Sequence, residues 1–300
     1  MPEASDTLPI VYAPQVFRPP SEADSLILQV TIGCSWNRCN FCSMYRNKNF
    51  RVRPIDEVKR EIHWAKGNVP DVHKVFLGDG DALIARAGFL AEICDLLQDT
   101  FPRLRRISCY ASPQALLLRS VEEMADLRAR GLTLYYLGVE SGDDDVLHDL
   151  DKGVDSKKMV AAGQRASAAG VKLSTMILLN AGGRSRSQAH ALGSAKVINA
   201  IQPKFVSTLV MTPTENAPLA QTAAEGNFEE LTPIELAAEL REFLSNLQLS
   251  SSIFRSNHAS NWLALAGNLP RDQEAMIQLL DRVLSDPEQA PFRPAWHRGL

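Results

Sequence analysis

Short apolar runs alternate with longer helical segments along most of this 300-residue sequence, and no other feature constrains its fold as strongly. The runs are rich in β-branched and other apolar residues, which is typical of buried strands. They are residues 26–32, 74–77, 106–110, 133–139, 173–179 and 205–211. The segments between them carry apolar residues at helical spacing, and Pro54 stands where the first of these helices would begin.

Six strands that alternate with helices predict an α/β fold with parallel strand pairing and right-handed crossovers. An open doubly wound sheet and a barrel both satisfy this pattern. In either fold, functional side chains are expected just beyond the carboxyl ends of the strands. The pattern divides the chain into an N-terminal arm (1–24), a domain that contains the six strands (25–211) and a C-terminal helical cap with a tail (212–300).

The composition excludes several classes of protein. An apolar content of 45% predicts a sizeable core, and a formal charge of −3 lacks the broad basic footprint of a dedicated nucleic-acid binder. No apolar leader and no stretch of membrane-spanning length is found, which favours the cytoplasm and no membrane partner. Three of the five cysteines fall within nine residues, and in a reducing compartment this crowding indicates a metal site.

The clustered cysteines are Cys34, Cys39 and Cys42, directly after the first predicted strand. Three thiolates on one loop can hold three irons of a cubane cluster and leave the fourth iron open to another ligand. The alternative is a structural zinc site, which needs a fourth ligand. The candidates for that ligand are His63, His73, Cys94 and Cys109. Cys94 and Cys109 lie in apolar runs and are expected to be small buried hydrophobes, which favours the iron–sulfur cluster.

Polar and glycine-rich segments follow the other strands. They are Gly78-Asp79-Gly80-Asp81, Ser112 before Pro113, Gly138-Val139-Glu140-Ser141-Gly142 followed by Lys152, and Asn180 before Gly182-Gly183. Ordinary turns explain some of them, because glycine, aspartate and serine are common turn residues. An acidic helix start explains Asp143–Asp145. It does not explain a carboxylate at a strand end followed by Ser-Gly.

The cysteine loop and these strand-end motifs resemble the radical S-adenosylmethionine (SAM) superfamily. The usual cysteine spacing there is C-x3-C-x2-C, with an aromatic residue before the last cysteine. This chain has C-x4-C-x2-C, one residue longer in the first gap, with Phe41 as the aromatic. The G-x-E-S-G run resembles the subgroup of oxygen-independent coproporphyrinogen III oxidase, the methylthiotransferases and the Elongator catalytic subunit.

The resemblance implies a partial (β/α)6 TIM-like barrel and two cofactors, a [4Fe-4S] cluster and SAM. Cys34, Cys39 and Cys42 would be the metal ligands and the catalytic residues. The reduced cluster would cleave SAM to a 5′-deoxyadenosyl radical that abstracts hydrogen from substrate. The SAM contacts implied are Phe41, Gly78, Asp79, Gly80, Asp81, Ser112, Glu140, Lys152 and Asn180.

Two further segments concern the substrate. The run from Arg255 to Trp262 is dense in hydrogen-bonding groups, and Arg255, Asn257, His258 and Asn261 are the candidate substrate contacts. The loop after the cysteines carries Arg46, Lys48, Arg51 and Arg53 between Tyr45 and Phe50, a pattern that suits anion or single-stranded nucleic-acid binding or a solvated linker.

We therefore expect a radical SAM enzyme that acts on a small molecule, with a flavodoxin or ferredoxin as electron donor. No second cysteine-rich region is found, so auxiliary clusters are not expected. An RNA- or peptide-modifying member of the same superfamily is one alternative. A non-catalytic zinc- or cluster-binding protein is the other.

Overall fold

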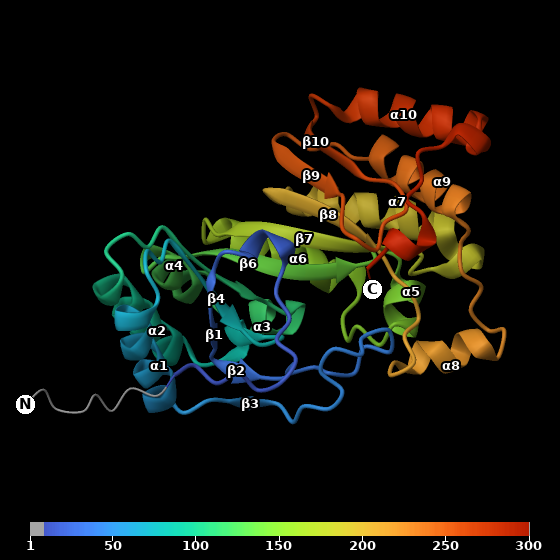
Figure 1. Cartoon of the computed structure of the whole chain (residues 1–300). Coiled ribbons are helices and arrows are strands. Elements are labelled where there is room, and N and C mark those ends of the chain that lie inside the picture. The colour runs from blue at the N-terminus through green and yellow to red at the C-terminus, as the bar shows by residue number, and fades with distance from the viewer. Residues whose placement is uncertain (1–8, 300) are drawn as a thin grey trace, which may run out of the picture. The chain divides into compact units, whose positions relative to one another are not determined.

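The computed structural model describes residues 9–299, which divide into two compact units (Figure 1). The first unit contains the chain up to residue 37 together with 44–136 and 168–172, and the second contains 38–43, 137–167 and the chain from 173 onward. Residues 1–8 of the expected N-terminal arm, 1–24, lie outside the described residues.

The first unit is a parallel sheet with helices. Its elements are η1 (Pro20–Glu22), β1 (Leu26–Gln29), β2 (Thr31–Ile32), β3 (Arg51–Val52), α1 (Ile55–Asn68), β4 (Lys74–Gly78), η2 (Ala82–Ile84), α2 (Ala87–Thr100), β5 (Arg106–Tyr110), α3 (Pro113–Leu118), α4 (Val121–Ala129) and the start of β6 (Leu132–Glu140). Strand β1 pairs with β4, β4 with β5 and β5 with β6, all parallel. Strands β2 and β3 form a separate antiparallel pair.

Helix α1 shows why these segments fold as predicted. Proline precedes its first turn, where no backbone donor is needed, and Asp56 and Glu57 are favourable beside the amino end of the helix dipole. Val58, Ile62 and Ala65 recur at helical spacing and are fully buried. The expected helix start at Pro54 is confirmed.

The second unit continues with the end of β6. Its other elements are α5 (Asp144–Asp149), α6 (Ser156–Ala168), β7 (Lys172–Leu179), α7 (Gly183–Ile201), β8 (Phe205–Val210), α8 (Pro218–Ala224), α9 (Pro233–Ser245), β9 (Ser252–Ser256), β10 (Leu265–Leu269), α10 (Gln273–Ser285), η3 (Pro287–Gln289) and η4 (Ala295–His297). Strands β7, β8 and β9 are parallel, and β10 pairs antiparallel with β9. Helices α7 and α10 both pack against α9 (Figure 1).

The two faces of the β7–β10 sheet differ, because successive side chains of a strand point to opposite sides. Leu179 and Val210 face the buried residues Leu236 and Leu240 of α9, so this is the helix-covered face. Leu178, one residue earlier, points the other way and packs beside Phe41 of the cysteine loop. The face that carries Leu178 is called the cysteine-side face below.

Helix α7 approaches the end of β6 through a pair of glycines. A Cβ atom on Gly142 would lie 2.1 Å from the carbonyl oxygen of Gly193, so no larger residue fits. The Gly142 amide also donates to the Ser194 hydroxyl at 3.0 Å. This contact fixes α7 against the turn that follows the Glu140 motif.

The predicted fold class is confirmed: the chain is α/β, and its sheets are mostly parallel. Strands lie in all six expected runs, but the first run, 26–32, is divided between β1 and β2, which belong to different sheets. The capping box at Thr232 and Glu235 opens α9 as predicted. Strand β10 was missed, although Leu265, Gly267 and Leu269 alternate with exposed residues as an edge strand should. Within the described residues, no helix has both the length and the apolar character needed to cross a membrane.

The glycine pair gives a prediction about stability. Gly142→Ala should lower the free energy of unfolding by about 3 kcal/mol, because the new methyl group meets rigid backbone rather than a movable side chain. Chemical denaturation of both chains measures the difference. The matched control is Gly67→Ala in α1, where a Cβ meets nothing within 4 Å; helix propensity should raise stability there by about 0.5 kcal/mol. Equal stability of Gly142→Ala and wild type would contradict the close contact.

Candidate active site

In the first unit, the residues around Cys34 are held by the turn that follows β4. Asp79 is fully buried, and its Oδ2 accepts hydrogen bonds from the Gly33 amide at 3.0 Å and from the Lys48 ammonium at 2.7 Å. The Gly80 amide donates to the Gly33 carbonyl at 3.0 Å. A buried carboxylate needs such partners, so Asp79 fixes the backbone directly before Cys34.

Asp81 connects the same loop to the end of β5. Its Oδ1 accepts from the Ser112 amide at 3.0 Å, its Oδ2 from the Ser112 hydroxyl at 2.7 Å, and Ser35 donates to Oδ2 as well. The Ser112 hydroxyl also caps α3 by accepting from the Ala115 amide at 3.0 Å. The side chains of Asp79, Asp81 and Ser112, three predicted SAM contacts, are thus engaged within the protein, and their contact with SAM stays a prediction.

In the second unit, Cys39 and Cys42 lie on a turn closed by a 3.1 Å bond from the Cys42 amide to the Cys39 carbonyl. Asn40 anchors this turn twice. Its amide donates to the Leu150 carbonyl just after α5 at 3.0 Å, and its carbonyl accepts from the Leu219 amide of α8 at 3.0 Å. Its side-chain amide bonds the Asp149 carbonyl as well. The turn is therefore fixed to the segment that follows the Glu140 motif.

Phe41, between these two cysteines, packs into an apolar cluster. Its neighbours come from the carboxyl ends of the strands and from the segments that follow them: Val146, Leu150, Leu178, Ala181, Met211, Leu219 and Phe228. Because this packing partly buries an aromatic side chain next to the cysteines, it helps to fix the turn and covers one side of it with apolar groups.

Glu140 and Lys152 form a buried ion pair at the end of β6. The Lys152 ammonium donates to Glu140 Oε1 at 2.9 Å, and each side chain is only about a tenth exposed. Gly138 makes the arrangement possible, because a Cβ there would lie 2.0 Å from the same carboxylate oxygen. Glu140 itself has φ = 63°, a left-handed conformation that is uncommon outside glycine and often marks functional positions. The strand end thus holds a buried cation and a buried anion close together, and the contact of Glu140 and Lys152 with SAM stays a prediction.

The predicted site residue Asn180 lies at the end of β7, also with positive φ, 74°, and is 1% exposed. Its side-chain amide donates to the Met211 carbonyl at 3.0 Å and accepts from the Leu231 amide at 2.9 Å. Its backbone amide donates to Glu239 Oε1 of α9 at 2.7 Å. Asn180 thus joins the ends of β7 and β8 to the segment before α9, and its contact with SAM stays a prediction.

Sequence reasoning missed two buried residues near these strand ends, His190 and Glu239. His190 Nδ1 lies 2.8 Å from the Ser141 hydroxyl, and its Nε2 lies 4.0 Å from Glu239 Oε1. Burial lowers the pKa of His190 to about 4 and raises the pKa of Glu239 to about 7, because each loses the solvation of its charged form. A carboxylate within the apolar stripe Leu236-Leu240-Phe243 was the available signal for Glu239.

The four candidate substrate residues lie in different environments. Asn261 is 1% exposed, and its amide bonds the Val210 amide at 2.9 Å and the Thr208 carbonyl at 2.8 Å, which completes the hydrogen bonding of β8 beyond the end of β9. His258 accepts from the Ser260 amide, and burial, aided by Arg293, lowers its pKa. Arg293 also donates to the carbonyls of Asn257 and His258.

Arg255 is exposed and lies on the cysteine-side face of the sheet. It pairs with Ser207, which pairs with Met176, two residues from Leu178, so all four share that face. Apart from a bond to the Phe254 carbonyl, no partner is found for its guanidinium among residues 9–299. Of the four candidates, Arg255 and Asn257 are exposed, so these two side chains are open to a ligand.

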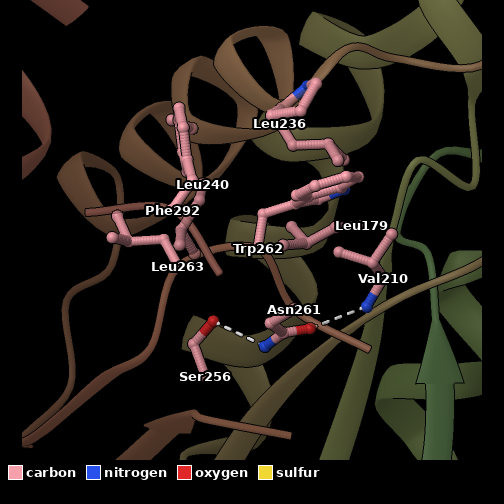
Figure 2. Close-up of a pocket in the computed structure, with 11 residues that line it drawn as sticks. Leu179, Val210, Leu236, Leu240, Ser256, Asn261, Trp262, Leu263 and Phe292 are labelled. Carbon is pink, nitrogen blue, oxygen red and sulfur yellow. Dashed lines mark hydrogen bonds between the residues drawn. The ribbon is translucent and has the colours of Figure 1, made fainter. Parts of the chain in front are cut away.

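Figure 2 shows a cavity on the opposite, helix-covered face, between Leu179, Val210 and the α9 residues Leu236 and Leu240. Trp262 and Phe292 close it, and the Asn261 amide bridges Val210 and Ser256 at its floor. Its volume of about 20 Å³ holds about one water molecule. This cavity is a packing gap in the core, too small for a substrate.

The burial and the pKa of the five cysteine thiols test whether the chain can hold an iron–sulfur cluster. Cys34, Cys39 and Cys42 are half-buried on one loop, whereas Cys94 and Cys109 are fully buried. Burial raises the pKa of the Cys94 thiol to about 12 and that of Cys109 well above its ordinary value, so neither is a ready metal ligand. No three His, Cys, Asp or Glu side chains of the described range are gathered to hold a metal ion. The fit therefore rests on chemistry: three accessible thiols suit an iron–sulfur cluster.

An α/β fold with a three-cysteine loop after its first strand, and polar groups at later strand ends, defines a class of cluster-dependent enzymes. The family model described as the radical SAM superfamily matches residues 28–184, more than half of the chain. The chain belongs to the radical SAM superfamily. Its members are enzymes that use a [4Fe-4S] cluster and SAM and that need an electron donor. No curated protein matches the chain.

Solved structures agree on the fold. Methylornithine synthase, PylB, is 17% identical with a TM-score of 0.52, over 75% of this chain and 63% of that one. Coproporphyrinogen III oxidase, HemN, from Escherichia coli is 16% identical with a TM-score of 0.55, over 74% and 51%. The Methanocaldococcus infernus Elp3 is 15% identical with a TM-score of 0.50, over 88% and 64%.

The chain thus spans between half and just under two thirds of the length of each of these proteins. The expected superfamily and fold class are confirmed.

The buried carboxyl group of Glu239 predicts how the stability of the protein depends on pH. Because its pKa is raised, the folded chain holds the Glu239 proton more tightly than the unfolded chain does. The free energy of unfolding therefore falls as the pH rises from the ordinary value of 4.5 to about 7. Glu239→Gln keeps an acceptor for the Asn180 amide but removes this titration. We expect the stability of Glu239→Gln relative to wild type to increase through this window by on the order of 2 kcal/mol.

Denaturation at several pH values measures this difference. His190 has the opposite effect, since its lowered pKa makes unfolding harder as the pH rises from about 4 to 6.5, but this contribution is common to both chains and cancels. Glu242→Gln, on the same helix, is the control and should run parallel to wild type. A pH-independent difference for Glu239→Gln would show that Glu239 does not titrate in this window.

Proposed function

We propose that Cys34, Cys39 and Cys42 hold a [4Fe-4S] cluster, and that the chain cleaves SAM reductively to a 5′-deoxyadenosyl radical that abstracts hydrogen from a small-molecule substrate. The observation that carries the proposal is the Cys39–Cys42 turn. It is bonded through Asn40 to the end of α5, between Glu140 and Lys152, in a chain whose family uses this chemistry. When bound, the cluster would supply the one electron that cleavage of SAM needs.

The residues of the chain bind and orient SAM. The Glu140–Lys152 pair offers one anion and one cation at the end of β6, suited to the zwitterionic methionine part of SAM. The backbone of Gly78–Asp81, held in place by the Asp79 and Asp81 side chains, offers further polar contacts. The apolar cluster around Phe41 excludes water from a reactive radical.

The structure favours a small-molecule substrate over RNA, because the cations of the loop 46–53 do not form an open basic patch. Lys48 is paired with Asp79, and Arg53 with Glu57 and Glu61. Arg46 donates to the Asn37 carbonyl. These contacts tie the loop to the folded chain, so it is neither a solvated linker nor an open phosphate-binding surface.

The cysteine-side face of β7–β9 supports a substrate with an apolar body and an anionic group. Met176, Leu178, Phe205 and Leu209 supply half-buried apolar surface, and Arg255 supplies an exposed guanidinium among them. A flavodoxin or ferredoxin would supply the electron. We place the reaction in the cytoplasm, where thiols are kept reduced.

Purification without oxygen tests the proposal. The wild type should carry about four irons and four sulfides per chain and little zinc, and reduced protein should convert SAM to 5′-deoxyadenosine. Cys34→Ala, Cys39→Ala and Cys42→Ala should each abolish cleavage. Cys94→Ala and Cys109→Ala are matched controls that should retain the cluster and the activity. Zinc in place of iron, or a complete cluster without SAM cleavage, would refute the proposed function.

Binding of single-stranded RNA separates this proposal from the RNA-modifying alternative. Since at least two of the four loop cations are paired with carboxylates, we expect weak affinity that changes little between about 50 and 200 mM salt. Fluorescence anisotropy with a labelled RNA of about 20 nucleotides measures it. Tight binding that falls steeply with salt, and that Arg51→Gln weakens, would instead favour an RNA substrate.

A further inference from the structure

The turn after β7 has a strained backbone conformation, which contacts from the surrounding structure must stabilise. Asn180 has φ = 74°, where residues other than glycine are strained, and it begins the Ala181-Gly182-Gly183 turn into α7. Its side-chain amide is already engaged with Met211 and Leu231. Its backbone amide has a separate partner, Glu239.

Glu239 reaches this amide from α9 and uses both carboxylate oxygens. Oε1 accepts from the Asn180 amide at 2.7 Å, and Oε2 accepts from the Ser187 hydroxyl of α7 at 2.6 Å. Glu239 is 3% exposed, so water cannot replace either contact. Loss of this acceptor would leave a buried donor without a partner, which costs far more than loss of an exposed hydrogen bond.

The Glu239 carboxylate also lies near His190, which contacts the end of β6. His190, 1% exposed, has Nε2 4.0 Å from Glu239 Oε1 and Nδ1 2.8 Å from the Ser141 hydroxyl. Ser141 directly follows Glu140. Four buried polar groups, Asn180, Glu239, His190 and Ser141, thus run from the end of β7 through α9 and α7 to the end of β6.

We propose that Glu239 is a positioning residue for SAM: by holding the Asn180 amide, it fixes the β7–α7 turn in the conformation that receives SAM. This inference rests on the proposed function, since it assumes that SAM lies at these strand ends. Glu239 itself touches no reacting atom and acts through Asn180.

The chemistry of the position agrees with this role. A leucine would fill the space on the apolar stripe of α9 without the cost of desolvating a carboxyl group. The carboxyl group is retained although burial raises its pKa to about 7, and perturbed ionisable groups of this kind concentrate near functional sites. Only an acceptor is needed, so a glutamine, which keeps one oxygen, should serve as well.

Two measurements on three variants test the proposal. Glu239→Leu removes the acceptor, Glu239→Gln keeps it, and Ser187→Ala removes the partner of Oε2 but leaves the Asn180 bond. Amide hydrogen exchange of the cluster-free chain, followed in peptides that cover residues 177–184, reports on the turn directly. Equilibrium binding of SAM to the anaerobically reconstituted protein reports on the site.

We expect Glu239→Leu to lose exchange protection in this peptide and to bind SAM about tenfold more weakly or worse. Glu239→Gln should restore both to within about twofold of wild type, and Ser187→Ala should keep both. Wild-type SAM affinity in Glu239→Leu, or unchanged exchange, would overturn the inference.

Should Glu239→Leu fail to fold, Glu239→Asp replaces it: the carboxylate remains but is one methylene short of the amide, and the same two losses are expected. If Glu239→Asp keeps both wild-type values, the inference is likewise wrong. A wild-type chain that binds no SAM would refute the proposed function instead, and the exchange measurement would still decide whether Glu239 holds the turn.

Discussion

Polar groups buried at the ends of parallel strands must find partners within the protein, and this requirement shapes each unit of the structure. In the first unit, Asp79 and Asp81 take up the amides and hydroxyls around Cys34 and at the end of β5. In the second unit, Glu140 pairs with Lys152, and the Asn180 amide pairs with Glu239. Each strand end is thus tied to a neighbouring loop or helix, which holds otherwise irregular turns in one conformation.

These contacts separate two roles that a motif can have. A side chain such as Asp81, with both oxygens engaged by Ser112 and Ser35, acts by shaping the loop whose backbone a ligand would meet. The Arg255 guanidinium, exposed on the cysteine-side face, is in a position to meet a ligand itself. Residues of the sequence motifs therefore divide into those that hold the backbone of the site in place and those whose side chains can contact a ligand.

The sequence predicted the strands, the helices and the cysteine loop because their signals are local. Hydrophobic periodicity and capping residues depend on neighbours a few positions away, as at Pro54 and Thr232. The pairing of Glu239 with Asn180 joins residues 59 positions apart, and no local pattern encodes such a contact. The role of Asn261 in completing β8 was missed for the same reason, because its polar neighbours indicated a site rather than a strand edge.

Asn40 and Phe41 have a consequence for how the chain would acquire its metal. Small metal-binding domains often order their ligands only when the metal arrives, so metal binding must offset the lost chain entropy. Here contacts made by the chain itself, backbone bonds and an apolar cluster, hold the Cys39–Cys42 turn. Under the proposed function, two of the three sulfur ligands would lie on a turn that folding of the chain orders, and cluster assembly would have less lost chain entropy to offset.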